Sequence, residues 1–216
     1  MGLFDWLSDD SSGHPGFFVG KKGPTQPVKF GRDIIVSALD SSQQDIDDIC
    51  ADLKKITSQR PSGIGSRLAS NRGIVQMYLI TLQSAAVFLY LIREQIPKDV
   101  LNSVMEGIKN GFSDFSTNFS APASQKVNNF LCTQFQICLR ALNEEINNAD
   151  EIDTFNSGTT ATLVTDLLAK ECKLDNLFQD SDTGALEKIM IERHIAVSGI
   201  IFILNVCPKL QITYRS

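Results

Sequence analysis

Histidine is scarce in this sequence: its 216 residues include only His14 and His194. A helical di-iron site takes a Glu-x-x-His pair from each of two helices, whereas this chain has one Glu-x-His, at Glu192–His194. It also has no Cys-x-x-Cys pair and no Cys/His cluster. We therefore expect no metal site and no cofactor.

Motifs of catalysis are missing as well. The glycine-rich stretch "PSGIGSR" (61–67) lacks the Gly-x-Ser-x-Gly order of a nucleophile elbow and the Gly-Lys-Ser/Thr ending of a phosphate-binding loop. Asp45, Asp47 and Asp48 fit the first turns of a helix, where acids interact favourably with the helix dipole. We assign no catalytic residue and expect a binding protein rather than an enzyme. A helical enzyme or small-ligand carrier with a pocket between helices is an alternative.

The cysteines show no pairing pattern. Their number is odd, and they are scattered along apolar stretches: Cys50, Cys132, Cys138, Cys172 and Cys207. Free cysteine behaves as a small apolar residue in protein cores, and an odd, scattered set is typical of a reducing compartment. The N-terminus also lacks the basic region and long apolar run of a secretion signal. We therefore expect a cytoplasmic protein.

Charge is low in total and unevenly distributed. The net charge of −5 disfavours nucleic acid as the main partner, because phosphate binding needs concentrated Lys and Arg. Residues 52–72 nevertheless carry five basic side chains against one acid, whereas residues 144–187 carry eleven acids against two lysines. The basic group consists of Lys54, Lys55, Arg60, Arg67 and Arg72. It is either a solvated face that complements the acidic one or a patch for an anionic partner.

Strand-like alternation is almost absent. It is limited to the fragments "FFV" (17–19), "VKF" (28–30) and "QITY" (211–214), two of which would pair as a minor β-ribbon. The stretch "DIIVSAL" (33–39) is too short to distinguish strand from helix. Most of the remaining chain places apolar residues three and four positions apart, the spacing of amphipathic helices. The fold class we predict is therefore all-α.

Helix signals divide the chain into an irregular N-terminal tail at 1–32 and one helical domain at 33–216. Ser41 and Gln44 have the spacing of a capping box, which predicts a helix start at that point. A long helix is expected at about 68–95, followed by four further helices. Gly107, on the next of these, predicts close approach by a neighbouring backbone. The domain is thus expected to be a bundle of about six helices.

The stretch "IVQMYLITLQSAAVFLYLI" (74–92) has no charged residue and is long enough to cross a bilayer. It also contains Gln76 and Gln83, seven residues apart and so on one helix face. A helix that is apolar all round is usually the buried axis of a bundle, and we expect that role here. The alternative is a membrane-active protein whose 74–92 helix inserts conditionally.

A second apolar stretch, at 195–207, is too short to span a bilayer and is expected to be a core helix. Its helix begins near Asp182–Thr183. It runs to Pro208 through recurring apolar residues, namely Ile189, Met190, Val197, Ile201 and Leu204.

The tail combines glycine and proline with large apolar side chains. Residues 1–31 hold six of the fourteen glycines and three of the seven prolines. The candidate partner-binding residues are Leu3, Phe4, Trp6, Phe17 and Phe18, since aromatic residues are frequent binding anchors. They would dock on the chain's own bundle, on a partner or sister subunit, or on a membrane surface. The function we expect is that of an intracellular adaptor that binds another protein or itself.

Overall fold

The computed structural model describes residues 18–20, 23–56, 63–147, 159–179, 182–206 and 210–211. Within these ranges the chain forms eight helices, six of them 14 residues or longer. The helices are α1 (Pro27–Ile56), α2 (Ile64–Ser70), α3 (Arg72–Arg93), α4 (Lys98–Ser116), α5 (Ala121–Asn147), α6 (Thr159–Cys172), α7 (Asp175–Gln179) and α8 (Asp182–Val206). The all-α class and the approximate number of helices are confirmed.

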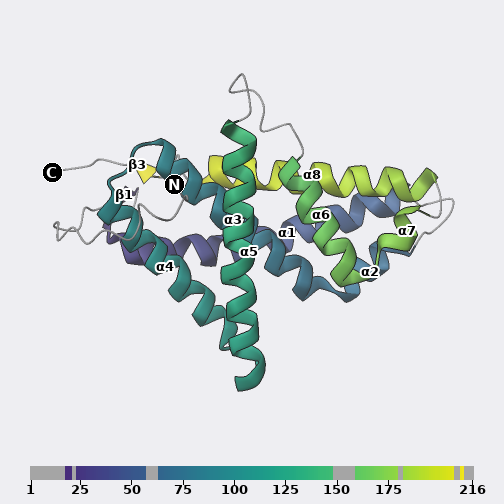
Figure 1. Cartoon of the computed structure of the whole chain (residues 1–216), viewed down its shortest axis with the longest axis horizontal. Coiled ribbons are helices and arrows are strands. Elements are labelled where there is room, and N and C mark those ends of the chain that lie inside the picture. Colours follow the sequence, from purple (N-terminus) through teal and green to yellow (C-terminus); the bar gives the residue numbers. More distant parts are fainter. Residues whose placement is uncertain are drawn as a thin grey trace.

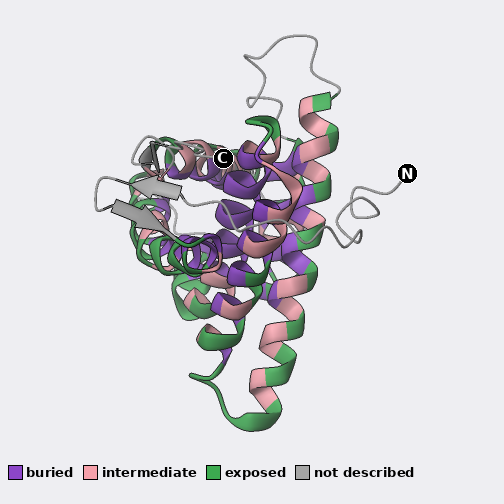
Figure 2. Ribbon diagram, turned by 90° about the vertical axis from the view of Figure 1, so that its left-hand side faces the viewer, coloured by how far each residue is buried: buried purple, intermediate pink, exposed green. Residues whose placement is uncertain are grey.

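The apolar helix α3 is the centre of the bundle. It packs against α1, α5, α6 and α8, and Figure 1 shows α5 crossing it near the middle of the molecule. Every residue from Tyr78 to Leu89 is buried, and Figure 2 shows the buried positions gathered between the helices. The predicted buried axis at about 74–92 is therefore confirmed.

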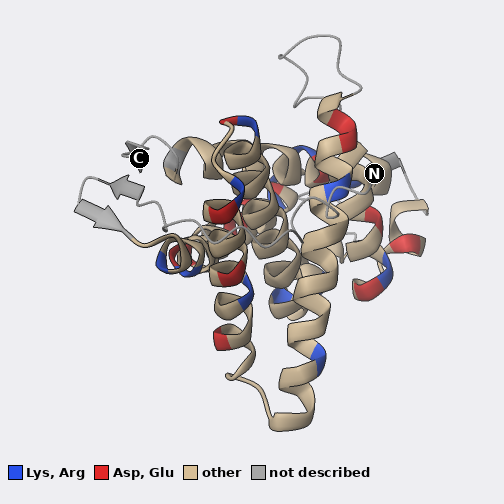
Figure 3. Cartoon of the chain, turned by 60° about the vertical axis from the view of Figure 1, so that its left-hand side comes forward, with Lys and Arg blue, Asp and Glu red and all other residues tan. Residues whose placement is uncertain are grey.

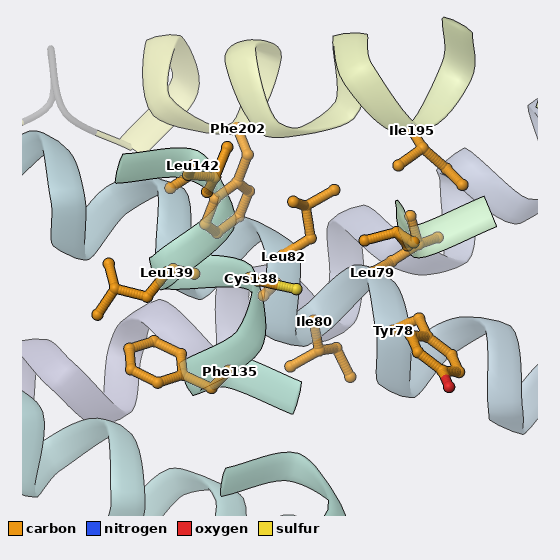
Figure 4. Close-up of a cluster of buried hydrophobic side chains, with 14 of the residues drawn as sticks. Tyr78, Leu79, Ile80, Leu82, Phe135, Cys138, Leu139, Leu142, Ile195 and Phe202 are labelled. Carbon is orange, nitrogen blue, oxygen red and sulfur yellow. The ribbon is translucent and has the colours of Figure 1, made fainter. Parts of the chain in front are cut away.

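Side chains of α8 and α5 complete the core around α3. Figure 4 shows Ile195 and Phe202 pointing from α8 toward Leu82 of α3. On the α5 side, the ring of Phe135 lies edge-on to Phe88, with the ring centroids 6.1 Å apart. Edge-to-face aromatic pairs at this distance stabilise a core beyond their apolar area alone.

Helices α1 and α4 touch through their backbones. A Cβ atom added to Gly107 would lie 2.0 Å from the carbonyl oxygen of Val28, and one added to Gly31 would lie 2.2 Å from that of Val104. Any side chain at these two positions would force the helices apart. The close approach that the sequence predicts at Gly107 is therefore confirmed.

The first helix starts earlier than the sequence pattern predicts. It begins at Pro27, so residues 27–32, "VKF" at 28–30 and the ambiguous 33–39 are all helical. The apolar series Phe30, Ile34 and Ala38 faces the core and continues the helix through the capping-box residues. Local spacing therefore gave the wrong start, because burial of this apolar face outweighs a capping signal.

The long helix expected at 68–95 is two helices separated at Asn71. The Asn71 side chain donates from Nδ2 to the carbonyl oxygen of Arg67 at 2.8 Å, which satisfies the end of α2. This bond lets the chain turn before α3 begins at Arg72.

Three short strands lie beside the helices: β1 (Phe18–Gly20), β2 (Gly23–Thr25) and β3 (Leu210–Gln211), in the order β2-β1-β3. β1 pairs antiparallel with β3, and Val19 lies opposite Gln211. The sheet therefore joins the chain just before α1 to the chain just after α8.

Candidate functional site

A partly buried polar cluster joins α1, α3 and α8. The Gln83 side chain is fully buried, and its amide nitrogen Nε2 lies 2.7 Å from Asp45 Oδ2 and 2.9 Å from Ser198 Oγ. The Ser198 hydroxyl in turn donates to Asp45 Oδ2 at 2.7 Å, and Ser41 Oγ accepts from the same amide at 3.2 Å. We call these four residues the polar seam. Each helix of the seam thus holds the others through a hydrogen bond.

Burial sets the electrostatics of the seam. It raises the pKa of the Asp45 carboxyl, and the hydrogen bond from Ser198 opposes this rise only in part. The Gln83 carbonyl oxygen Oε1 has no hydrogen-bond partner among the described residues. An unpaired buried carbonyl costs free energy, so this atom offsets part of the stability that the seam's hydrogen bonds contribute.

A second tie lies two helical turns further along α1. His194 Nε2 is 3.0 Å from Asp52 Oδ2, and Lys55 Nζ is 2.6 Å from Asp52 Oδ1. The hydrogen bonds from Lys55 and His194 lower the pKa of Asp52. His194 is thus a helix residue held against α1.

Serine, histidine and aspartate come close in this region without forming a catalytic arrangement. Nucleophilic catalysis needs the serine hydroxyl to donate to the histidine. Here Ser198 donates to Asp45 and His194 binds Asp52, so the two pairs are separate. The arrangement fixes α8 to α1 instead of activating a nucleophile.

The described thiols are unsuited to nucleophilic attack. Burial raises the pKa of Cys138 to about 12 and that of Cys172 to about 11. Because only the thiolate is nucleophilic, both side chains are inert at neutral pH. Cys50 and Cys132 are also free thiols, and the pKa of each is raised by burial. Among the described residues no group of His, Cys, Asp and Glu has the arrangement of a metal site.

An exposed apolar stripe runs along the outside of α8. Its side chains are between 40% and 62% exposed: Leu186, Ile189, Val197, Ile201 and Leu204. They recur at steps of three and four except between Ile189 and Val197, where Arg193 occupies the intervening position. Arg193 is the charged residue at an exposed position within this stripe. We call these six residues the α8 outer face. Scattered apolar residues are normal on a protein surface, whereas a contiguous apolar face usually marks an interaction site.

A small cavity opens at the C-terminal end of this face. It has a volume of about 150 Å³ and lies between the ends of α3, α5 and α8. Its lining is apolar apart from one guanidinium and consists of Leu89, Tyr90, Arg93, Ile146, Ile200, Ile203 and Leu204. An apolar cavity of about this volume accepts one aromatic ring.

Three of the basic residues singled out in the sequence are bound within the protein. Arg72 Nη1 lies 2.6 Å from Asp47 Oδ1, Lys55 pairs with Asp52, and Arg67 Nη1 donates to the Lys173 carbonyl oxygen at 2.9 Å. The last contact brings the basic segment against the acidic one. Figure 3 shows basic and acidic residues interspersed along the helices.

The remaining candidates of the sequence analysis lie at or beyond the edge of the described residues. Lys54 occupies the last turn of α1, whereas Arg60, Leu3, Phe4, Trp6 and Phe17 lie outside the described ranges. Phe18 opens strand β1, and its side chain lies outside the description.

The sequence analysis missed both the seam and the outer face. Asp45 is not in a first helical turn but in the middle of α1, and Ser41 binds Gln83 instead of capping a helix. On α8, the core-facing residues are Ile191, Ile195 and Phe202. Of the apolar residues that recur along the predicted core helix, Ile189, Val197, Ile201 and Leu204 are exposed and Met190 is half-buried. Helical periodicity does not distinguish the two faces because α8 is apolar on both.

The chain matches no family model, no curated protein and no solved structure. Its function must therefore be argued from the site itself.

Proposed function

We propose that this chain is a non-enzymatic helical protein that binds another protein through the α8 outer face. One observation carries the proposal: a helix that is apolar on both faces leaves one of them in solvent. Ile189 and Leu204, for example, are 60% and 62% exposed. When a partner covers apolar area of this kind, the removal of that area from water stabilises the complex.

The shape of the face suits an elongated partner segment. The stretch from Leu186 to Leu204 is about 27 Å long at 1.5 Å per residue. A helix or extended peptide lying along it would meet apolar side chains on both sides of Arg193. The cavity beside Leu204 then supplies the pocket for one anchoring ring, the usual form of a binding hot spot.

The basic residues at the face favour a partner segment that carries acidic side chains. Arg193 lies within the face and Arg93 lines the cavity, so acidic side chains on the partner would be paired. A second copy of this chain suits the face less well. Two outer faces packed antiparallel would bring their Arg193 side chains close together, and Glu192, their nearest acid on α8, is already near Lys188.

Small-molecule chemistry is less well supported. The cavity of about 150 Å³ is below the volume of roughly 300 Å³ at which small-molecule pockets usually begin. The free thiols of Cys50, Cys132, Cys138 and Cys172 support, as part of the proposal, a reducing cytoplasmic location.

Conditional membrane insertion is the second candidate function. Helix α3 is long and apolar enough to cross a membrane, with a mean hydropathy of 1.7 over its most apolar stretch, but 78% of that stretch is buried in the bundle. Insertion would therefore require α3 to leave the core and to break the bonds of Gln83. Flotation with liposomes between pH 4.5 and pH 7.5 tests this, and protein that stays at the bottom throughout would eliminate it.

Site-specific photocrosslinking tests the protein-binding proposal. Benzophenone-alanine placed at Ile201 of the full chain should give an adduct heavier than the chain in an extract of the cells that produce it. The matched control places the same group at Val36, an exposed apolar residue of α1. Equal labelling from both positions, or none from position 201, would refute the outer face as the binding surface.

A further inference from the structure

We propose that the apolar N-terminal segment Leu3–Leu7 of this same chain occupies the α8 outer face and competes there with the partner. The inference rests on the proposed function, because it uses the same surface. It names the chemistry that this surface takes and adds a mechanism that regulates access to it. Three observations support it: the point at which the N-terminal segment is attached, the length of that segment, and its apolar and acidic composition.

The N-terminal segment is tethered at the C-terminal end of α8. Strand β1 begins at Phe18 and pairs with β3, with Gly20 opposite Leu210. β3 begins four residues after Val206, the last residue of α8. Four residues span at most about 14 Å. Phe18 lies two residues further from α8 than Gly20, so the segment departs from a point within roughly 26 Å of Val206. That is the end of α8 that carries Leu204 and the cavity.

Its length is sufficient to reach the face. Leu7 lies eleven positions before Phe18, and an extended chain over that interval spans up to roughly 36–40 Å. The whole outer face is about 27 Å long. A short tether of this kind gives an effective concentration on the order of millimolar, so even a weak intrinsic affinity would suffice.

Composition matches the face in both apolar character and charge. The segment "LFDWL" places Leu3, Phe4, Trp6 and Leu7 around one acid, Asp5. Asp9 and Asp10 follow, and residues 1–17 contain neither Lys nor Arg. The cavity accepts one ring, which either Phe4 or Trp6 supplies. Arg193 is exposed within the face, and Arg93, which also donates to Asn147 Oδ1, lines the cavity, so both are placed to pair with the acids.

Trp6 makes the contact directly measurable because it is the only tryptophan in the chain. In the full-length protein, docking should give a blue-shifted tryptophan emission that acrylamide quenches poorly. The double substitution Ile201→Ser and Leu204→Ser should shift the emission to the red and make quenching several-fold more efficient. Both residues are largely exposed, so circular dichroism should show the same helix content and cooperative melt.

Two further variants sharpen the result. Val36→Ser removes an equally exposed apolar side chain from α1 and should leave the emission unchanged. Arg193→Glu should shift it partly to the red, because it places an acid opposite the acidic segment. Identical emission from the parent and the double variant would overturn the proposal, as would a red shift produced by Val36→Ser alone.

Dilution distinguishes docking within one chain from docking between two copies of the chain. Docking within one chain predicts an emission that does not change over a hundred-fold dilution and a monomeric mass by light scattering. A blue shift that is lost on dilution together with a dimeric mass would overturn docking within the chain and assign the face to a second copy.

Crosslinking distinguishes failure of this inference from failure of the proposed function. With benzophenone at position 201, the substitutions Phe4→Ser, Trp6→Ser and Leu7→Ser in the full chain should raise the yield of the heavier adduct several-fold. An unchanged yield, with no response of Trp6 to the α8 substitutions, would remove the docking segment and leave the proposed function standing. A response of Trp6 without any heavier adduct would remove the partner and show that the face serves only the chain's own segment.

Discussion

Helices α3 and α8 are the two most apolar long helices described, and they are used differently. α3 is covered by α1, α5, α6 and α8 and exposes almost nothing between Tyr78 and Leu89. α8 packs on α1, α3, α6 and α7 from one side, which leaves the α8 outer face in solvent. Apolar composition thus measures how much area a helix has to bury, whereas its position in the bundle decides how much it does bury.

The difference also explains where binding capacity lies. The apolar area of α3 is already removed from water and contributes to folding. The outer face of α8 retains area that is available only for association. The polar seam holds the two helices in this relation, since Gln83 of α3 and Ser198 of α8 share Asp45.

The same substitution in both helices gives the largest contrast. Ile80 of α3 is 1% exposed and Ile201 of α8 is 48% exposed. We expect Ile80→Asp to abolish cooperative folding, because burying an unpaired charge costs several kcal/mol. Ile201→Asp should change the free energy of unfolding by no more than about 0.5 kcal/mol. Circular dichroism melts of both variants measure this, and a soluble, cooperatively melting Ile80→Asp protein would contradict the buried axis.

Removal of the seam's amide should have the next largest effect. Gln83→Met keeps the volume but takes a donor away from Asp45, and loss of a hydrogen bond to a charged group costs about 1.5–3 kcal/mol. Elimination of the unpaired Oε1 offsets part of this, so we expect a net loss of about 1–2 kcal/mol in urea titrations.

Gln76→Met is the matched control for that variant. Gln76 lies on the same face of α3, is only half-buried, and donates to the Leu39 carbonyl oxygen at 3.4 Å. Its replacement should cost less than about 0.5 kcal/mol. Equal losses at the two positions would mean that the seam contributes nothing beyond side-chain packing.

The sequence predicts α3 well because a long helix without charged residues is buried at the centre of a helical bundle. The two glutamines fall on one face, as their spacing requires, and both bind α1. Periodicity fails for the start of α1, where a Ser-x-x-Gln pattern inside a helix imitates a helix start. The apolar face that continues from Phe30 shows that the pattern lies inside a helix and not at its start. The burial of that face depends on tertiary packing, which local spacing does not reveal.

The candidate site was largely unpredictable for a different reason. The seam draws Asp45 from α1, Gln83 from α3 and Ser198 from α8, positions that no local spacing connects. The sequence does not predict which face of α8 is exposed. Both faces of this helix are apolar, so no run of polar residues marks the solvent side. The sequence did contain one signal, the absence of charge from residues 195–206, but this signal shows only that the helix is apolar.

Neutralising the shared carboxylate should have a smaller, pH-dependent effect. Burial raises the pKa of Asp45, so the folded protein binds this proton more tightly than the unfolded chain does. Ionised Asp45 therefore lowers the stability of the parent protein above its folded-state pKa, and this loss disappears as pH falls toward and below the ordinary value of 3.8.

Asp45→Asn keeps an acceptor for Ser198 and removes the charge. Because Asp45 is only half-buried and solvent screens its charge, we expect the free energy of unfolding at pH 7 to rise by less than about 1 kcal/mol. This advantage should shrink as pH is lowered toward 4. Urea titrations across this range measure the difference. A gain that grows as pH falls would have the opposite sign and would show that the carboxylate is stabilised in the folded protein.

The smallest expected effect tests how closely the two apolar helices approach. A Cβ atom added to Gly199 of α8 would lie 3.7 Å from Cβ of Ala86 in α3, an ordinary contact distance. Because glycine inside a helix costs about 0.5–1 kcal/mol relative to alanine, Gly199→Ala should stabilise the protein by that amount. Gly73→Ala, in the first turn of α3 with no atom within 4 Å of the added Cβ, should give a similar gain. If thermal melts show a gain at Gly73 and a loss at Gly199, α8 lies deeper against α3, and less of its outer face is left for a partner.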